Sequence, residues 1–197
     1  MLDAARRLFT ERGYAATSRQ AVARAAGVAP QTVAAVAGTK RGLLEAVVDD
    51  AARSDGQPLP VALRSWLQEL REQADAASLL RAHARSSAEV SRHTAGVTEA
   101  FRRAAAADPG IAELWEDFSQ QRRRGQATVV ELLAQRGPLR TGLSQSEAAD
   151  VLWVLTDDAL YSALVGERGW SHDRFAAWCG DTMCRTLLRP ETFGNEP

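Results

Sequence analysis

The sequence predicts an all-α protein with a small N-terminal domain and a larger helical body. Runs of alternating Val, Ile and Thr and Asn-Gly hairpin turns, which would indicate strands, are nearly absent, whereas Ala and Arg are abundant. Hydrophobic residues make up 45% and charged residues 25% of the 197-residue chain, a balance typical of globular proteins and not of disordered ones. We therefore expect every element to be a helix.

The first helix is expected over residues 3–11, where four apolar side chains share one face: Leu2, Ala5, Leu8 and Phe9. Gly13 can end this helix in a left-handed cap. Thr17 and Ser18 then offer N-cap oxygens to a second helix that runs to about Ala25.

Two further helices complete the N-terminal domain. Gly27 breaks the second helix, and Pro30, at a first-turn position, starts a third helix that runs to about Val36. Thr39 caps a fourth helix, which fades near Arg53 and turns four apolar residues inward: Leu43, Leu44, Val47 and Val48.

The clearest change of composition lies at residues 54–60, a Pro- and Gly-containing segment. We place the domain boundary there, with residues 1–53 as one domain and 54–197 as the other. Pro and Gly stops divide the second domain into six expected helices, at about 61–72, 75–92, 95–107, 110–136, 144–167 and 172–189.

Charge is distributed unevenly between the two domains. Residues 1–53 hold eight basic and five acidic side chains, a net +3, and the remainder holds 16 basic and 20 acidic, a net −4. This distribution fits a polyanion-binding head on a body with another task, although chance could produce it.

Several classes of protein are disfavoured by the sequence. The N-terminus has an acid at Asp3 and no apolar run, and Gly and Pro interrupt the longest uncharged stretch, so we expect a soluble cytoplasmic protein. Cys179 and Cys184 point in different directions on a helix, which excludes a mutual disulfide and weakens a metal site. No nucleophile elbow, phosphate loop or HExxH motif indicates an enzyme, and no cofactor is implied.

Residues 19–38 fit a helix-turn-helix. Ala23 is small enough for two helices to cross, Gly27 allows a sharp turn, and the inner faces would bury Val22, Ala26, Val28, Val33 and Val36. The second helix would enter the major groove, where Gln31 and Thr32 suit base edges. Lys40 and the backbone N–H groups at the start of the next helix would meet a phosphate.

The N-terminal fifty residues contain a series of motifs: Leu8-Phe9-Thr-Glu-Arg-Gly13-Tyr14, Thr17-Ser18, Ala26-Gly27-Val28, Thr32-Val33 and Thr39-Lys40-Arg-Gly-Leu43-Leu44. In these motifs and their spacing the chain closely resembles TetR-type transcriptional regulators. The resemblance implies a three-helix DNA-binding head on a helical ligand-binding and dimerising body, acting as a homodimer on palindromic operators. It also implies a set of DNA-binding residues: Thr17, Ser18, Arg19, Gln31, Thr32, Ala34, Ala35 and Lys40. More loosely, segments 121–139, 148–153 and 165–170 of the body resemble one subgroup.

The third helix departs from the family pattern. The family usually has Tyr at position 34, an aromatic residue or His at 36 and Phe at 37, where this chain has Ala34, Val36 and Ala37. The tyrosine normally meets the DNA backbone and the phenylalanine fills the core, so Leu43, Leu44 or Phe9 must fill that room here. Weaker DNA binding, or an operator read by small side chains, would follow.

Bulky and polar body residues suggest a ligand pocket, and each also has a plainer reading as core. The candidate pocket residues are Trp66, His83, Phe101, Trp115, Phe118, Trp153, Asp157 and Tyr161. Trp153, Asp157 and Tyr161 would share one helical face, where a carboxylate between aromatic rings could receive a cation. The alternatives are a solvated edge or an ion pair with Arg for Asp157, and an ordinary satisfied helical position for His83. The run 122–124 of three arginines reads as a solvated face.

The last two expected helices have the length and apolar faces of a dimer bundle, with candidate interface residues Val151, Leu155, Leu164, Phe175, Trp178, Met183 and Leu187. The favoured function is a ligand-released repressor. A DNA-binding structural or cell-division protein without inducer, and a ligand-binding dimer that has lost specific DNA binding, remain open.

Overall fold

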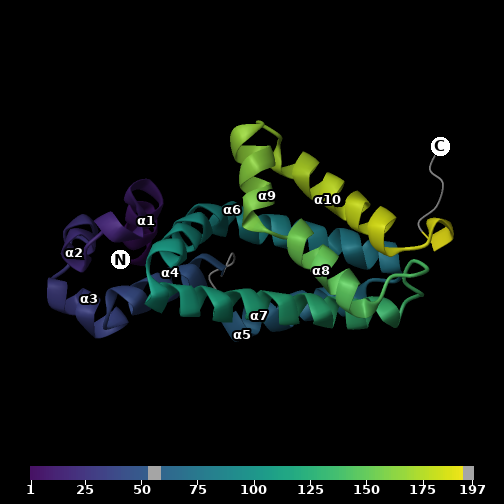
Figure 1. The fold of residues 1–197 in the computed structure, drawn as a ribbon, viewed down its shortest axis with the longest axis horizontal. Helices are drawn as coiled ribbons and strands as arrows, with labels where there is room; N and C mark the ends of the chain where they lie inside the picture. Colours follow the sequence, from purple (N-terminus) through teal and green to yellow (C-terminus); the bar gives the residue numbers. More distant parts are fainter. Residues whose placement is uncertain (53–58, 193–197) are drawn as a thin grey trace. The chain divides into compact units, whose positions relative to one another are not determined.

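The computed structural model describes residues 1–52 and 59–192. Helices dominate these residues and none of them forms a strand; a single bridge pairs Leu139 with Leu188 (Figure 1). The predicted all-α class is therefore confirmed. No helix in the described part of the chain is long and apolar enough to cross a membrane.

Two compact units divide the chain. Unit 1 comprises residues 1–59 and 93–118, and unit 2 comprises residues 60–92 and 119–197. Helices α6 (Ala76–Ala107) and α7 (Pro109–Ala134) contribute residues to both units. The boundary predicted between residues 53 and 54 lies at the start of 53–58, outside the described residues, and it stays a prediction.

Unit 1 begins with four helices: α1 (Leu2–Ala16), α2 (Arg19–Ala26), α3 (Pro30–Ala37) and α4 (Lys40–Ala52). The predicted signals around α2 and α4 are confirmed, and Gly27 ends α2 in the left-handed region. The prediction that Gly13 ends the first helix in a left-handed cap is wrong: Gly13 kinks α1 with a φ of 78° and a ψ of 165°, and the helix continues to Ala16. The Ser18 hydroxyl accepts from the Ala21 N–H, and the Thr39 hydroxyl from the Gly42 N–H.

The core of unit 1 joins α1–α4 to α6 and α7. Phe9, Leu43 and Leu44 are fully buried there, and Ala37 packs against the same cluster. These three large side chains are the ones expected to fill the room beside Ala37. α6 and α7 complete the cluster with Val97, Ala100, Phe101, Ala104 and Ile111.

One residue of the predicted helix-turn-helix core is misplaced. Val22 and Val33 are buried, but Val36 is 60% exposed, so the prediction that it faces inward is wrong. Helix α3 rests on the domain through Val33 and, one turn later, Ala37, and this stripe leaves Val36 on the solvent side.

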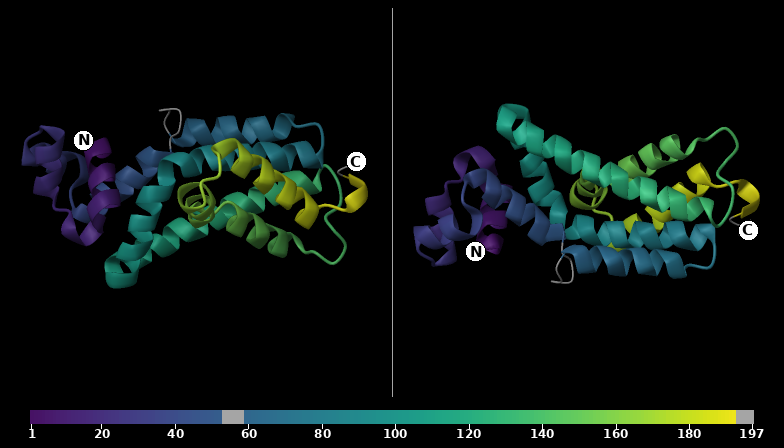
Figure 2. Two further views of the ribbon diagram at one scale, coloured as in Figure 1. Left: turned by 90° about the horizontal axis from the view of Figure 1, so that it is seen from above. Right: turned by 90° about the horizontal axis from the view of Figure 1, so that it is seen from below.

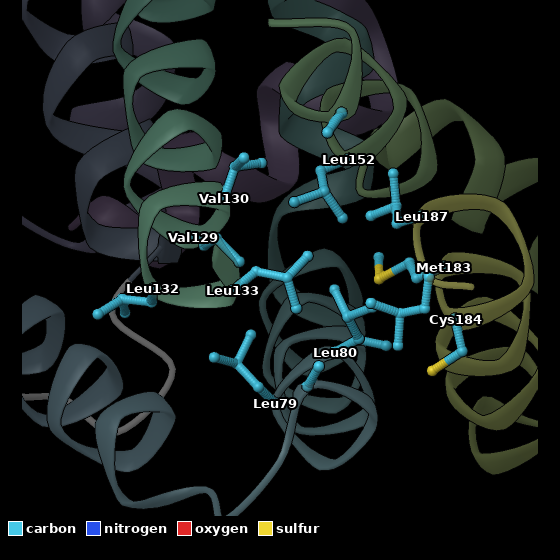
Figure 3. Packing of buried hydrophobic residues seen from close by; sticks show 14 of the residues in the cluster. Leu79, Leu80, Val129, Val130, Leu132, Leu133, Leu152, Met183, Cys184 and Leu187 are labelled. Carbon is cyan, nitrogen blue, oxygen red and sulfur yellow. The ribbon is translucent and has the colours of Figure 1, made fainter. Parts of the chain in front are cut away.

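Unit 2 contains α5 (Leu59–Glu72) and the unit's parts of α6 and α7. These are followed by α8 (Gln145–Leu155), α9 (Asp158–Tyr161), a π-helix at Ser162–Glu167, α10 (His172–Leu187) and a short 3₁₀ helix at Pro190–Thr192. Its apolar core is formed where α6, α7, α8 and α10 meet (Figure 3). The views of Figures 1 and 2 place the α7–α8 loop beside the end of α10. There the Arg140 N–H donates to the Leu187 carbonyl over 2.8 Å.

After the first four helices, two more expected helix boundaries are wrong. The helices expected at 75–92 and 95–107 are one continuous helix, α6. The helix expected at 144–167 ends at Leu155, because Asp157 caps α9 by accepting from the Ala159 N–H over 2.8 Å.

Candidate functional site

Helix α3 presents polar and small side chains to solvent. Gln31, Thr32, Ala34 and Ala35 are exposed, while Val33 is buried beneath them. The N-terminal half therefore offers an amide and a hydroxyl, and the remainder offers methyl groups, a combination that can read base edges and thymine methyls. Val36 extends the methyl surface, and sequence reasoning missed it by assigning it to the core.

The residues before α2 divide into internal and exposed groups. Thr17 is buried, and its hydroxyl lies within hydrogen-bonding distance of the Leu8 (3.1 Å) and Gly13 (2.9 Å) carbonyls. It stabilises the turn after α1 and does not face solvent. Ser18 is exposed but serves as the N-cap of α2. Arg19 is exposed and donates to the Gly38 carbonyl at the end of α3.

Lys40 is held against the end of α1. Its Nζ lies 4.3 Å from the centre of the Tyr14 ring and donates to the Ala15 carbonyl over 3.2 Å. Burial lowers the pKa of Lys40, and the Asp108 carboxylate partly opposes this. Lys40 thus places a cation in the first turn of α4, near the backbone N–H groups that suit a phosphate.

In unit 2, His83 forms a buried polar pair with a residue that sequence reasoning missed. Its Nε2 lies 2.8 Å from Oε1 of Gln126, and its ring is 5.6 Å from the Trp66 ring. Burial lowers the pKa of His83 to about 4, so the imidazole is neutral. Its Nδ1 is buried and has no hydrogen-bond partner among the described residues.

Asp157 forms an ion pair with Arg122 of α7. The guanidinium lies 3.1 Å from the Asp157 carboxylate and also donates to the Trp153 and Thr156 carbonyls. The prediction that Trp153, Asp157 and Tyr161 share one helical face is wrong, because the helix breaks between them. The ion pair considered as an alternative is observed, and Arg122, at 19% side-chain exposure, is not on a solvated face.

The other candidate pocket residues belong to separate clusters. Phe101, Trp115 and Phe118 form a three-ring cluster in unit 1, with centroids 5.0–5.7 Å apart. Tyr161 packs edge-on against Phe175 in unit 2, and its hydroxyl lies 3.2 Å from His172 Nδ1. Within unit 2, contacts link Trp66 to His83 and Trp153 to Asp157 through Arg122.

The candidate dimer residues differ in exposure. Phe175, Met183 and Leu187 are buried within the unit, so they contribute to its core. Four others are half-buried: Val151, Leu155, Leu164 and Trp178. Val154, which the sequence did not single out, is 54% exposed on α8. Both cysteines are buried and free, and burial raises the pKa of Cys179 to about 12.

Comparison with known protein families finds a match for the residues that contain the helix-turn-helix. Residues 1–47 match the family model for bacterial regulatory proteins of the tetR family. The match covers the N-terminal domain, so this domain is of the tetR regulator type. The predicted resemblance of these residues to TetR-type transcriptional regulators is thereby confirmed.

Several solved structures share the fold over nearly the whole chain. SmeT in its triclosan complex is 20% identical, with a TM-score of 0.74, over 100% of this chain and 93% of that one. FadR from Bacillus subtilis, in complex with stearoyl-CoA, is 15% identical with a TM-score of 0.73, over 92% and 95%. A regulator from Saccharomonospora viridis in complex with choline is 21% identical with a TM-score of 0.68, over 95% of each chain. None of the curated proteins compared matches the chain.

Proposed function

We propose that this chain is a tetR-family repressor that binds a palindromic operator as a cytoplasmic homodimer and is released by a small-molecule ligand. The observation that carries the DNA-binding part is the exposed surface of α3, with Gln31 and Thr32 at its N-terminal end and Val33 anchoring it from below. A helix that packs against its domain on one face and is exposed on the other can enter the major groove.

The symmetry of the operator follows from that of the dimer. A two-fold dimer presents two copies of α3 and therefore reads two half-sites of opposite orientation. The half-buried apolar residues of α8 and α10, with the exposed Val154, support an interface on these helices.

The ligand-responsive part is supported by the polar groups of unit 2 and by the ligand complexes of structures with the same fold. A ligand that binds one conformation of the body better than another shifts the population, and so changes the affinity for DNA. α6 and α7 belong to both units, so a change at one part of either helix can bias the other part.

Operator binding is the test of the proposal. The full chain is titrated against labelled DNA from immediately upstream of its own coding region, with an unrelated fragment as control, from low to physiological salt. We expect preferential binding that survives physiological salt, because base contacts, unlike phosphate contacts, discriminate between sequences. The double variant Gln31→Ala/Thr32→Ala should reduce the preference. No binding to any DNA by a folded dimer would overturn the proposal.

One alternative has its own support. Ala34 and Ala37 replace the family's aromatic residues in α3, which favours a ligand-binding dimer without specific DNA binding. Equal affinity for both fragments would support this alternative or an inducer-free structural role, and a ligand-dependent rise in melting temperature would separate the two.

A further inference from the structure

We propose that His83 is the polar anchor of the ligand site in unit 2, and that it selects an uncharged ligand carrying a hydroxyl or N–H donor on an apolar body. The inference deepens the proposed function, since it rests on unit 2 being the ligand-responsive part of the chain. It names the chemistry of the ligand and the atom that recognises it.

The first step is the proton arrangement of the imidazole. His83 is 1% exposed, and its Nε2 lies 2.8 Å from the amide oxygen of Gln126. An amide oxygen only accepts, so Nε2 carries the proton and donates it. In a neutral ring the other nitrogen, Nδ1, is then an acceptor. The pKa of about 4, caused by burial, agrees with a neutral ring.

The second step is that this acceptor is unsatisfied. Nδ1 is buried and has no partner among the described residues. Buried polar atoms are almost always hydrogen-bonded, because desolvation without a new bond costs free energy. A donor from outside the described residues is therefore the natural partner of Nδ1, and a bound ligand can supply it.

The third step is the apolar surroundings. The Trp66 ring lies 5.6 Å from the imidazole, and the preceding turn of α6 carries Leu79 and Leu80. On α7, Val129 and Val130 follow Gln126 by one turn and belong to the same core (Figure 3). Apolar neighbours of this kind favour a ligand with an apolar body that makes a single directional hydrogen bond.

The fourth step concerns charge. Arg122, one turn before Gln126 on α7, pairs with Asp157 at 3.1 Å and also donates to two carbonyls of the α8–α9 connection. The two charges compensate each other, so the pair gives no net attraction for a cation or an anion. Since a buried unpaired charge is strongly unfavourable, an uncharged ligand is selected.

The experiment compares two probes of nearly equal shape with the full chain. 1-Naphthol carries a hydroxyl donor, and 1-methoxynaphthalene replaces that donor with an ether oxygen that can only accept. Dissociation constants are measured by equilibrium dialysis, with choline as a charged probe. We expect naphthol to bind at least ten-fold more tightly than the ether, and choline not to bind at the same concentration.

Two variants of His83 separate the acceptor from the fold. His83→Gln places an amide N–H at the position of Nε2, which donates to Gln126, but it has no acceptor at the position of Nδ1. The affinities of this variant for naphthol and for its ether should therefore agree to within two-fold. His83→Asn places an acceptor near Nδ1 and should keep the preference. Arg85→Ala, at an exposed position on α6, is the matched control. Circular dichroism and urea unfolding verify that each variant is folded.

Each contrary result identifies what fails. Equal binding of naphthol and its ether, tighter binding of the ether, or an unchanged preference in folded His83→Gln would overturn the inference. Binding of neither probe would also overturn it and would indicate that a buried water serves Nδ1. If the chain binds naphthol as expected but binds no DNA, the proposed function is wrong and the inference about the ligand is retained. If it binds DNA specifically but does not bind naphthol, the inference about the ligand is wrong and the proposed function is retained.

Discussion

Burial of His83 makes the stability of the protein depend on pH. The pKa of this histidine falls from about 6.5 in the unfolded chain to about 4 in the folded one. Between these values the unfolded chain binds more protons, so lowering the pH favours unfolding. The stabilisation is fully present above pH 6.5, and about 3 kcal/mol of it is lost by pH 4.

We expect His83→Gln to lose about 3 kcal/mol less stability than the parent between pH 7 and pH 4. Urea unfolding of both proteins at four pH values measures this difference. Above pH 7 the histidine is neutral in both states, so the two stability curves should run parallel there, which is the internal control. Curves that stay parallel down to pH 4 would show that the residue at position 83 is not a buried neutral histidine.

Among the elements, the connection from α8 to α9 depends most on a side chain distant in sequence. Arg122 of α7 donates to the Trp153 and Thr156 carbonyls at the end of α8 and pairs with the Asp157 cap of α9. One guanidinium therefore donates hydrogen bonds to the free carbonyls at the end of α8 and balances the charge of the carboxylate that caps α9.

We expect Arg122→Gln to lower the free energy of unfolding by about 2–4 kcal/mol, because it removes the guanidinium from a mostly buried carboxylate and from two carbonyls. The neighbouring Arg123 provides the control, since it pairs with Asp150 at about the same distance but with both side chains more than half exposed. Arg123→Gln should cost less than about 1 kcal/mol. Equal costs in denaturant unfolding would argue against a structural role for the Arg122 pair.

Within unit 1, α1 and α6 approach closely at Gly96. A Cβ added there would lie 2.8 Å from the Thr10 Cγ2, closer than carbon atoms pack. We expect Gly96→Ala to destabilise the protein by about 1 kcal/mol, because the clash outweighs the better helix propensity of alanine. In a Thr10→Ala background the same change should stabilise by about 0.5–1 kcal/mol.

A double-mutant cycle of thermal or urea unfolding measures that coupling. If Gly96→Ala has the same effect in both backgrounds, the two helices do not make this contact in solution. A positive coupling would establish that α6 is tied to the first helix of the DNA-binding head.

The elements that the sequence predicted correctly are those determined by local chemistry. Ser18 and Thr39 cap helices through their own hydroxyls, and Gly27 adopts a conformation available to few other residues. Each of these signals acts within a few residues of the chain, so a single sequence contains it.

The elements that the sequence misplaced depend on partners distant in the chain. The break at Asp157 is supported by Arg122, which lies 35 positions earlier. The packing of Val33 in the core determines which face of α3 is buried. The spacing of apolar residues in the sequence did not show that Val36 lies outside that face. For the candidate site, residue types on α3 could be read directly, whereas the His83–Gln126 pair required the packing of α6 on α7.

For the whole molecule, Val36 and Val154 are the two exposed large hydrophobic residues of the described chain, and they lie in different units. An exposed valine has no core role, so each is a candidate for contact with another molecule. The proposed function assigns DNA to Val36 on α3 and the second subunit to Val154 on α8. The same substitution at each position can therefore test which of the two residues contacts DNA and which contacts the second subunit.

We expect Val36→Glu to weaken operator binding at least ten-fold while the protein stays dimeric, because a carboxylate beside the groove faces the phosphate charge. Val154→Glu should instead shift the chain towards monomer in sedimentation velocity, because the symmetry of the dimer places a carboxylate from each subunit in the same interface. Its DNA binding should then become dependent on protein concentration, and recover as the dimer re-forms. Each variant is the control for the other, since both add one charge at an exposed valine. A dimeric Val154→Glu would exclude this face of α8 from the interface, and unchanged DNA affinity in Val36→Glu would place the DNA away from the C-terminal half of α3.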